Sequence, residues 1–305
     1  MLRWRIISAI VIIAIFASAC FLDISYPLFG VGGLWLMPLG LVVTVLATFE
    51  VRHLVFKQIT GLHLGMLTLG NLLIFASAAI PVFVPELRND SAVGRLGLPM
   101  LVFALATCFA FAEQMRTYRS ENRTLSRLGR SVLAMAYAGL LMSFFVSLRM
   151  LPHNPLGFVA LSSLIIVVKM SDIGAYTVGR ICGGRFFGHA RLAPILSPKK
   201  TIEGCAGGVA FGCLGSYLSL VWIGPLIVGE SFVVPRWWAW LGYGVVLTIT
   251  GMFGDLAESL LKREAGAKDS SHWLPGLGGI LDLLDSILFA APVAYAIWSM
   301  GILGS

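Results

Sequence analysis

The sequence predicts an all-α, polytopic membrane protein with about nine transmembrane helices. Of its 305 residues, 58% are hydrophobic and 12% are charged, whereas soluble domains carry roughly 25% charged residues. Apolar windows of about 20 residues recur along the chain, and a window of this length can cross a bilayer as a helix. The sequence has no alternating apolar and polar pattern that would indicate a β-barrel.

The expected spans follow the apolar windows in chain order. The first window, in MLRWRIISAIVIIAIFASACFLD, is long and further spans follow it, so we expect an uncleaved helix rather than a signal peptide. Gly30, Gly32 and Gly33 interrupt the second window, where two shorter pieces are an alternative. The nine spans lie near 5–22, 27–48, 61–85, 97–113, 131–150, 156–179, 203–228, 237–261 and 279–303.

Positive charge supports this count and gives an orientation. With the N-terminus in the cytoplasm, 17 of the 22 lysines and arginines fall in cytoplasmic segments, four fall outside, and Lys169 lies within the sixth span. Positively charged loops stay cytoplasmic, so we expect an N-in, C-out topology. The same rule, together with anionic headgroups, explains the net charge of +7 without a nucleic-acid partner.

The two halves of the chain differ in polar content. We expect residues 1–150 to form transmembrane helices that face lipid and act as a scaffold. We expect residues 151–305 to form a transmembrane catalytic part. Two basic cytoplasmic loops rich in glycine and proline, 180–203 and 262–278, belong to this second part.

Ionisable residues within the spans concentrate in the sixth, eighth and ninth. A charge at the bilayer centre costs at least about 2.5–3.5 kcal/mol, so such residues are functional candidates. Helical spacing gives each of these spans a polar face, formed by Lys169, Asp172, Asp255, Glu258, Ser259, Lys262, Asp282 and Asp285.

Carboxylate oxygens are the ligands that Mg²⁺ takes together with substrate phosphates. The polar faces therefore predict a cation site that contains Asp255, Asp282 and Asp285. The alternative is internal pairing, of Lys169 with Asp172 and of Lys262 with Asp255 or Glu258.

The loop ILSPKKTIEG, residues 195–204, suggests a phosphate site. Ser197 can cap a helix and Pro198 suits its first position, which would place Lys199 and Lys200 at a helix N-terminus. Free N–H groups there favour anions. The alternative is a cytoplasmic loop with ordinary topogenic lysines.

Three segments together carry a resemblance to a known family. SDIGAYTVGR (171–180) and LAPILSPKKTIEG (192–204) precede a signature with preserved spacing. The signature residues are Ser259, Lys262, Arg263, Lys268, Asp269, Pro275, Gly276, Gly278, Gly279, Asp282 and Asp285. Over residues 165–290 the chain resembles the phosphatidate cytidylyltransferase family, also called CDP-diglyceride synthetases. It departs from the family at Leu277 and Leu283, where the family has histidine and arginine.

The resemblance implies that CTP and phosphatidic acid react to give CDP-diacylglycerol and pyrophosphate. It implies catalytic roles for Asp255, Lys262, Asp282 and Asp285, with Mg²⁺ at the three aspartates and a second cation left open. The substrate-binding residues would be Asp172, Ser197, Lys199, Lys200, Thr201, Glu203, Ser259, Arg263, Lys268, Asp269, Gly276, Gly278 and Gly279.

Two other functions fit parts of the pattern. A CTP-dependent lipid kinase acting on polyprenols or phytol shares the nucleotide and the membrane setting. An ion-coupled transporter would use the carboxylates as a cation site, but nearer the bilayer midplane. The expected setting is a bacterial inner membrane with the active site on the cytoplasmic side, and a homodimer is left open.

Overall fold

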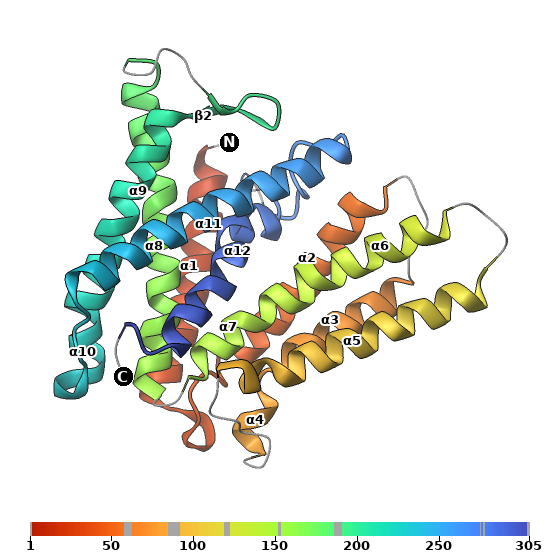
Figure 1. Ribbon diagram of the computed structural model, residues 1–305, viewed down its shortest axis with the longest axis horizontal. Helices are drawn as coiled ribbons and strands as arrows, with labels where there is room; N and C mark the ends of the chain where they lie inside the picture. The colour runs from red at the N-terminus through yellow and green to blue at the C-terminus, as the bar shows by residue number, and fades with distance from the viewer. Residues whose placement is uncertain are drawn as a thin grey trace. The chain divides into compact units, whose positions relative to one another are not determined.

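The computed structural model describes residues 2–57, 63–84, 92–118, 123–151, 154–185, 191–274, 276 and 278–303. This part of the chain is helical apart from one two-stranded sheet (Figure 1), which confirms the predicted all-α class. It divides into two compact units, each built from two stretches of sequence. The first unit holds Met1–Met150 and Leu261–Leu284, and the second holds Leu151–Leu260 and Asp285–Ser305. The scaffold and catalytic roles of 1–150 and 151–305 stay predictions.

The first unit is a bundle of apolar helices. In Figure 1, α2, α3, α5 and α6 run side by side, with α3 packed against both α2 and α5. The buried Asn71 Nδ2 on α3 donates a 2.8 Å hydrogen bond to Thr48 Oγ1 on α2. The elements are α1 (Leu2–Ser25), η1 (Leu28–Gly30), α2 (Met37–Val55), α3 (Leu64–Ser77), α4 (Ile80–Phe83), α5 (Ala92–Arg116), α6 (Thr124–Met135), η3 (Ala136–Leu140) and α7 (Leu141–Arg149).

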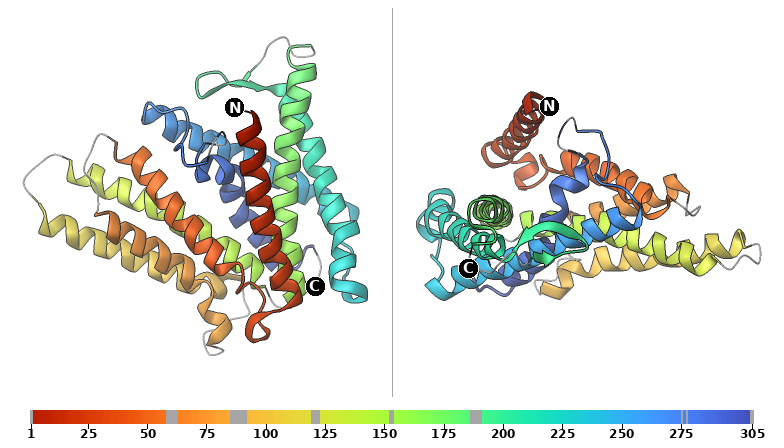
Figure 2. Two further views of the ribbon diagram at one scale, coloured as in Figure 1. Left: turned by 180° about the vertical axis from the view of Figure 1, so that it is seen from behind. Right: turned by 90° about the horizontal axis from the view of Figure 1, so that it is seen from above.

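The second unit is centred on two helices that pack through glycines. The views in Figure 2 show α8 and α9 side by side. A Cβ atom on Gly174 of α8 would lie 2.5 Å from Phe211 Cβ, and one on Gly207 of α9 would lie 2.4 Å from Val178 Cβ. Small residues let helix backbones approach closely in membranes. The elements are α8 (Asn154–Cys182), β1 (Arg191–Ala193), β2 (Ser197–Thr201), α9 (Ile202–Tyr217), η4 (Leu218–Ile223), α10 (Gly224–Val228) and η5 (Gly229–Ser231). Helices α11 (Trp237–Glu264) and α12 (Ile280–Ser299) also belong to it, except for residues 261–264 and 280–284, which belong to the first unit.

Eight helices in the described part of the chain are long and apolar enough to cross a membrane. The chain is therefore a polytopic membrane protein, as predicted. The window near 61–85 differs, because it forms the 14-residue α3 and then the short α4 that starts beside Pro81. At 1.5 Å per residue α3 is about 21 Å long, less than the roughly 30 Å hydrocarbon core. The N-in, C-out topology stays a prediction.

The second predicted span begins later than expected, at Met37 rather than near residue 27. The preceding connection is fixed by the buried Asp23, whose Oδ1 accepts a 2.7 Å hydrogen bond from Gly33 N. Asp23 Oδ2 accepts from Arg149 Nε of α7 at 2.7 Å, and the two side chains form a buried ion pair. Gly33 has φ +98°, and a Cβ there would lie 3.0 Å from Arg149 Cγ. This buried polar contact favours a compact turn over a helix.

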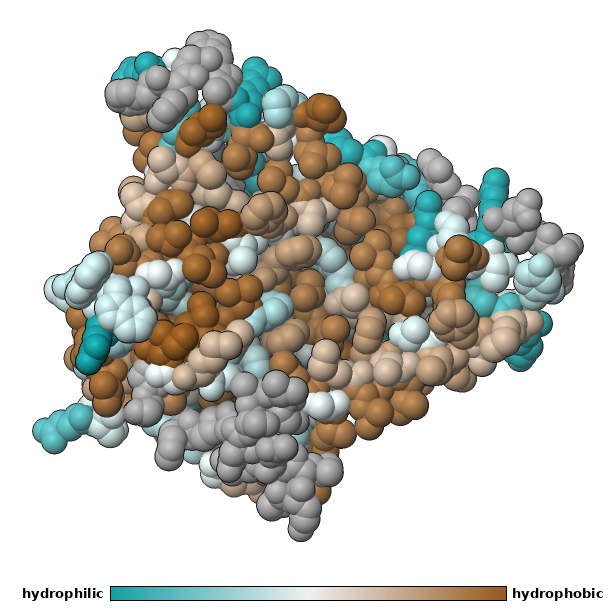
Figure 3. Space-filling model, viewed as in Figure 1, coloured by the Kyte–Doolittle hydropathy of each residue, from teal (hydrophilic) through white to brown (hydrophobic). Residues whose placement is uncertain are grey.

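Large apolar side chains remain exposed on helices of both units. Phe109 on α5 and Phe253 on α11 are 55% and 62% exposed. Apolar residues dominate the face shown in Figure 3, while hydrophilic ones gather near helix ends. Such extensive apolar exposure is typical of a surface that contacts lipid rather than water.

The close contact between α8 and α9 gives a stability prediction. Gly207→Ala would place a methyl group against Val178 Cβ and Gly174 O, and overpacking of this kind costs about 1–3 kcal/mol. Gly242→Ala on α11 is the matched control, because a Cβ there meets nothing within 4 Å. Thermal unfolding in detergent should show a lower midpoint for the first variant only. Equal midpoints would contradict the glycine-mediated packing.

Candidate functional site

The signature segment, residues 259–285, begins near the C-terminal end of α11. Gly266, with φ +59°, donates its N–H to Arg263 O at 3.0 Å, and Ala267 N donates to Lys262 O at 2.8 Å. This pair of bonds is a Schellman motif, which terminates a helix at a glycine. Lys57 Nζ, just beyond α2, donates to Ala265 O at 2.7 Å. The end of α11 is thereby tied to the N-terminal part of the chain within the first unit.

The chain then reverses in a tight turn before α12. Leu274 N donates to Gly278 O at 3.0 Å, and Gly278 N donates to Leu274 O at 3.2 Å. Gly276 and Gly278 have φ of +81° and +93°, a region that side chains with a Cβ rarely adopt. Pro275 and Leu277 lie outside the described residues, and so does the departure from the family at Leu277.

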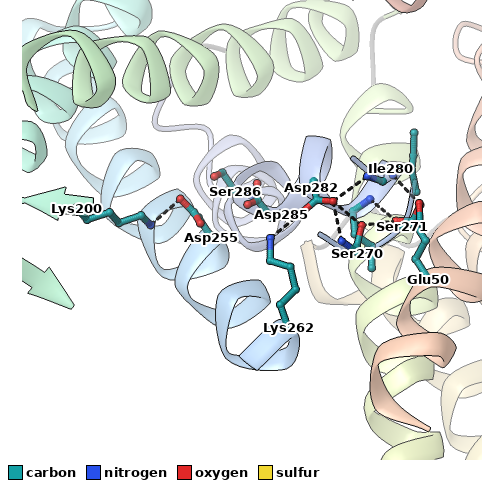
Figure 4. A network of polar contacts seen from close by, with 12 residues as sticks. Glu50, Lys200, Asp255, Lys262, Ser270, Ser271, Ile280, Asp282, Asp285 and Ser286 are labelled. Atoms are coloured by element: carbon teal, nitrogen blue, oxygen red, sulfur yellow. Dashed lines mark hydrogen bonds and ion pairs between the residues drawn. The ribbon is translucent and has the colours of Figure 1, made fainter. Parts of the chain in front are cut away.

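Asp282 organises this turn and is held by four donors (Figure 4). Its Oδ1 accepts from Lys262 Nζ at 2.7 Å. Its Oδ2 accepts from Ser270 N at 2.9 Å, Ser270 Oγ at 2.8 Å and Gly279 N at 2.8 Å. An ionised carboxylate offers about four lone-pair sites. The bond to Gly279 N also closes the first turn of α12, as the third residue of a capping box does.

Gly278 and Gly279 are required by these contacts. A Cβ on Gly278 would lie 2.6 Å from Asp282 Oδ2, and one on Gly279 would lie 2.0 Å from Ser270 Oγ. Their role in substrate binding stays a prediction. The structure shows that they allow the backbone to approach a carboxylate and a hydroxyl of the protein itself.

A second polar cluster lies in the second unit. Lys200 Nζ on β2 pairs with Asp255 Oδ2 on α11 at 2.6 Å (Figure 4), and Lys169 pairs with Asp172 on α8 at 3.3 Å. Asp285 on α12 interacts electrostatically with Asp255, Asp172 and Lys169. A Cβ on Gly254 would lie 2.4 Å from Asp285 O, so α11 and α12 approach closely beside Asp255. Three carboxylates and two ammonium groups give this cluster a net negative charge.

The expected helix cap at Ser197 and Pro198 is wrong. Residues Ser197–Thr201 form β2, which pairs antiparallel with β1, and Ser197 lies opposite Ala193. Helix α9 starts at Ile202, and its cap is Thr201, whose Oγ1 accepts from Gly204 N at 3.1 Å. The strand is favoured because β1 supplies backbone hydrogen-bonding partners for it. These partners cannot be identified from residues 195–204 alone. Successive side chains of a strand alternate in direction, which is consistent with Lys199 being exposed while Lys200 pairs with Asp255.

The remaining candidates differ in how deeply they are buried. Glu203, in the first turn of α9, is buried and its Oε1 accepts from Gly184 N at 3.1 Å. Ser259 on α11 is partly buried. The exposed candidates are Asp172, Lys199, Arg263, Lys268, Asp269 and Gly276.

The carboxylates suit a hard cation by their chemistry, because Mg²⁺ prefers oxygen ligands. In the described part of the chain, no three side chains of His, Cys, Asp or Glu come together as a metal site. Asp255 and Asp282 are each neutralised by a lysine. Each of these carboxylates is thus suited to a cation by its chemistry, and the lysine beside it would have to yield its contact.

Sequence reasoning missed Glu50, a buried residue of α2 that is 1% exposed. It lies two residues beyond the expected end of the second span, so its burial was not anticipated. The available signal is a lone acid inside the apolar run VLATFEVRHLVF. Its carboxylate accepts hydrogen bonds from the signature segment, including Ile280 N and Leu281 N.

Comparison with known proteins agrees with the geometry. A family model described as the Cytidylyltransferase family matches residues 3–300. A Bacillus subtilis phosphatidate cytidylyltransferase is 32% identical over 247 residues, which cover 73% of this chain and 86% of that protein. Proteins of the same name from Chlamydia trachomatis and Synechocystis are 36% and 33% identical, over 58% and 64% of their own lengths. The first of these matches spans 59% of this chain and the second 58%.

The family match covers nearly the whole chain, including both units and the signature segment between Ser259 and Asp285. The chain therefore belongs to the cytidylyltransferase family.

Proposed function

We propose that the protein is a phosphatidate cytidylyltransferase, an enzyme that uses CTP and phosphatidic acid to make CDP-diacylglycerol and pyrophosphate. The observation that carries the proposal is the similarity to the Bacillus subtilis phosphatidate cytidylyltransferase across 86% of its length. The pairing of Asp255 and Asp282 with lysines supports it, because the carboxylates could exchange these contacts for a cation and the lysines for phosphate.

The chemistry needs no nucleophile from the protein. A phosphate oxygen of phosphatidic acid would attack the α-phosphorus of CTP and form a new P–O bond. The bond between the α-phosphorus and the bridging oxygen would break, and pyrophosphate would leave with that electron pair. Catalysis of phosphoryl transfer rests on positioning and electrostatic stabilisation. The protein would therefore supply cations and donors around the phosphates.

The basic candidates differ in how exposed their side chains are. Lys199 and Arg263 are exposed and would meet phosphate oxygens directly. Lys200 and Lys262 would do so while still close to Asp255 and Asp282. Asp172 would orient Lys169. The other substrate-binding candidates keep the roles that the resemblance implies.

A divalent cation is part of the proposal, with Asp255, Asp282 and Asp285 as its candidate ligands. When bound, Mg²⁺ would neutralise charge on the triphosphate and on the leaving pyrophosphate. The bilayer would supply the lipid substrate. A bacterial inner membrane with the site on its cytoplasmic side is the setting that fits the basic loops.

A labelling experiment tests the reaction class. Membranes containing the protein should transfer label from α-³²P CTP to phosphatidic acid when Mg²⁺ is present and lose this activity in EDTA. γ-³²P CTP should label no lipid. Transfer of γ-label to an added polyprenol would indicate a lipid kinase instead. No label in lipid from either nucleotide would contradict both enzymatic readings.

The ion pair in the second unit gives a mutational prediction. Asp255→Asn removes the charge opposite Lys200 and one candidate cation ligand, so cytidylyl transfer should fall at least about 100-fold, the loss seen when a charge-stabilising group is removed. Glu230→Gln is the matched control, because Glu230 is exposed on η5 and outside the candidate set. Rates are compared at equal amounts of folded protein. A near-normal rate for Asp255→Asn would overturn the role of this carboxylate.

A further inference from the structure

We propose that Glu50 of α2 is a positioning residue for cytidylyl transfer. It holds the start of α12 and the Ser270–Ser271 turn, and through them it fixes Asp282. The inference rests on the proposed function for its effect on rate, but its structural part stands on the contacts of Glu50 alone. All of these contacts lie within the first unit.

Four donor atoms lie within hydrogen-bonding distance of Glu50, two at each carboxylate oxygen (Figure 4). Its Oε1 accepts from Ser271 Oγ at 2.6 Å and Ile280 N at 2.9 Å. Its Oε2 accepts from Ser270 Oγ at 2.9 Å and Leu281 N at 2.8 Å. The donors lie 220 to 231 residues away along the chain. One side chain of α2 thus fixes both ends of the 270–281 segment.

The two backbone donors are the first N–H groups of α12. These groups have no partner inside a helix and must be satisfied from outside. The positive end of the helix dipole also favours an anion there. Gly279 N donates to Asp282. The two carboxylates together therefore accept hydrogen bonds from three successive N–H groups at the start of α12.

Ser270 connects the two carboxylates. Its hydroxyl oxygen lies 2.9 Å from Glu50 Oε2 and 2.8 Å from Asp282 Oδ2, so the two carboxylates share its single proton. Its backbone N–H also donates to Asp282. A shift of Glu50 would therefore move Ser270, and with it two of the four donor atoms around Asp282.

The packing leaves no room for this network to adjust. A Cβ on Gly279 would lie 2.5 Å from Glu50 Oε2. Phe49, the neighbour of Glu50 in the chain, packs against Trp273 with ring centroids 5.9 Å apart and ring planes tilted by 58°. Both neighbours hold the segment against α2.

A carboxylate is needed because each of its two oxygens accepts from a backbone N–H. In Glu50→Gln the amide nitrogen would replace one oxygen and would face a backbone N–H, of Ile280 or of Leu281, in either orientation. A backbone N–H cannot reverse to become an acceptor. The isosteric variant therefore breaks one half of the network without changing its volume.

The experiment compares Glu50→Gln with Asn71→Leu. The control removes a buried hydrogen bond between α3 and α2 in the same unit, and Asn71 touches no candidate residue in a described hydrogen bond. For each purified protein in detergent we would measure cytidylyl transfer per folded molecule and hydrogen–deuterium exchange over residues 270–281. Glu50→Gln should lower kcat/KM by about 10- to 100-fold, as loss of an outer hydrogen-bond partner does, and speed exchange at Ile280 and Leu281. Asn71→Leu should do neither, even if it lowers the unfolding midpoint.

Each result decides the inference. Unchanged exchange at Ile280 and Leu281 in Glu50→Gln would overturn the anchoring of α12. Faster exchange with an unchanged kcat/KM would leave Glu50 structural and overturn its positioning role. If the unmodified protein transfers no cytidylyl group, the proposed function fails, and the exchange data alone still test the anchor.

Discussion

The first N–H groups of α12 must find acceptors outside their own helix, and the signature segment is built around this demand. Glu50 and Asp282 supply the acceptors, and Ser270 joins them. The turn between Leu274 and Gly278, the glycines after it and the close of α11 at Gly266 all bring the chain to these two carboxylates. A helix N-terminus that could have bound a free phosphate is thus occupied by the protein itself.

Three aspartates in the described part of the chain are each paired with a cationic side chain. Asp23 pairs with Arg149, Asp282 with Lys262, and Asp255 with Lys200. The first pair is deeply buried and links α1 to α7, whereas the other two join residues of the candidate set. Breaking a buried pair leaves an uncompensated charge, which is far costlier than losing both partners. The two lysine pairs are less buried, so the proposed cation could displace these lysines at lower cost.

The sequence was sufficient for the class of fold and for the family, and less so for local geometry. Hydropathy located the long spans, because length and composition alone decide whether a helix can cross a bilayer. The prediction from sequence was wrong at Ser197, where pairing with β1 replaces the expected helix cap. It was also wrong at the start of α2, where Asp23 holds the preceding turn. Glu50 could not be linked to Ile280 from the sequence, since no local pattern reports a contact across 230 residues.

The contact between Gly279 and Glu50 has an evolutionary consequence. Residue 279 can gain a side chain only if residues 50 and 270 both withdraw, because its Cβ would overlap their oxygen atoms. A lineage that changes one of the three before the others would pass through a poorly assembled intermediate. The residues at positions 50, 270 and 279 lie far apart in the sequence, but they should therefore be conserved together.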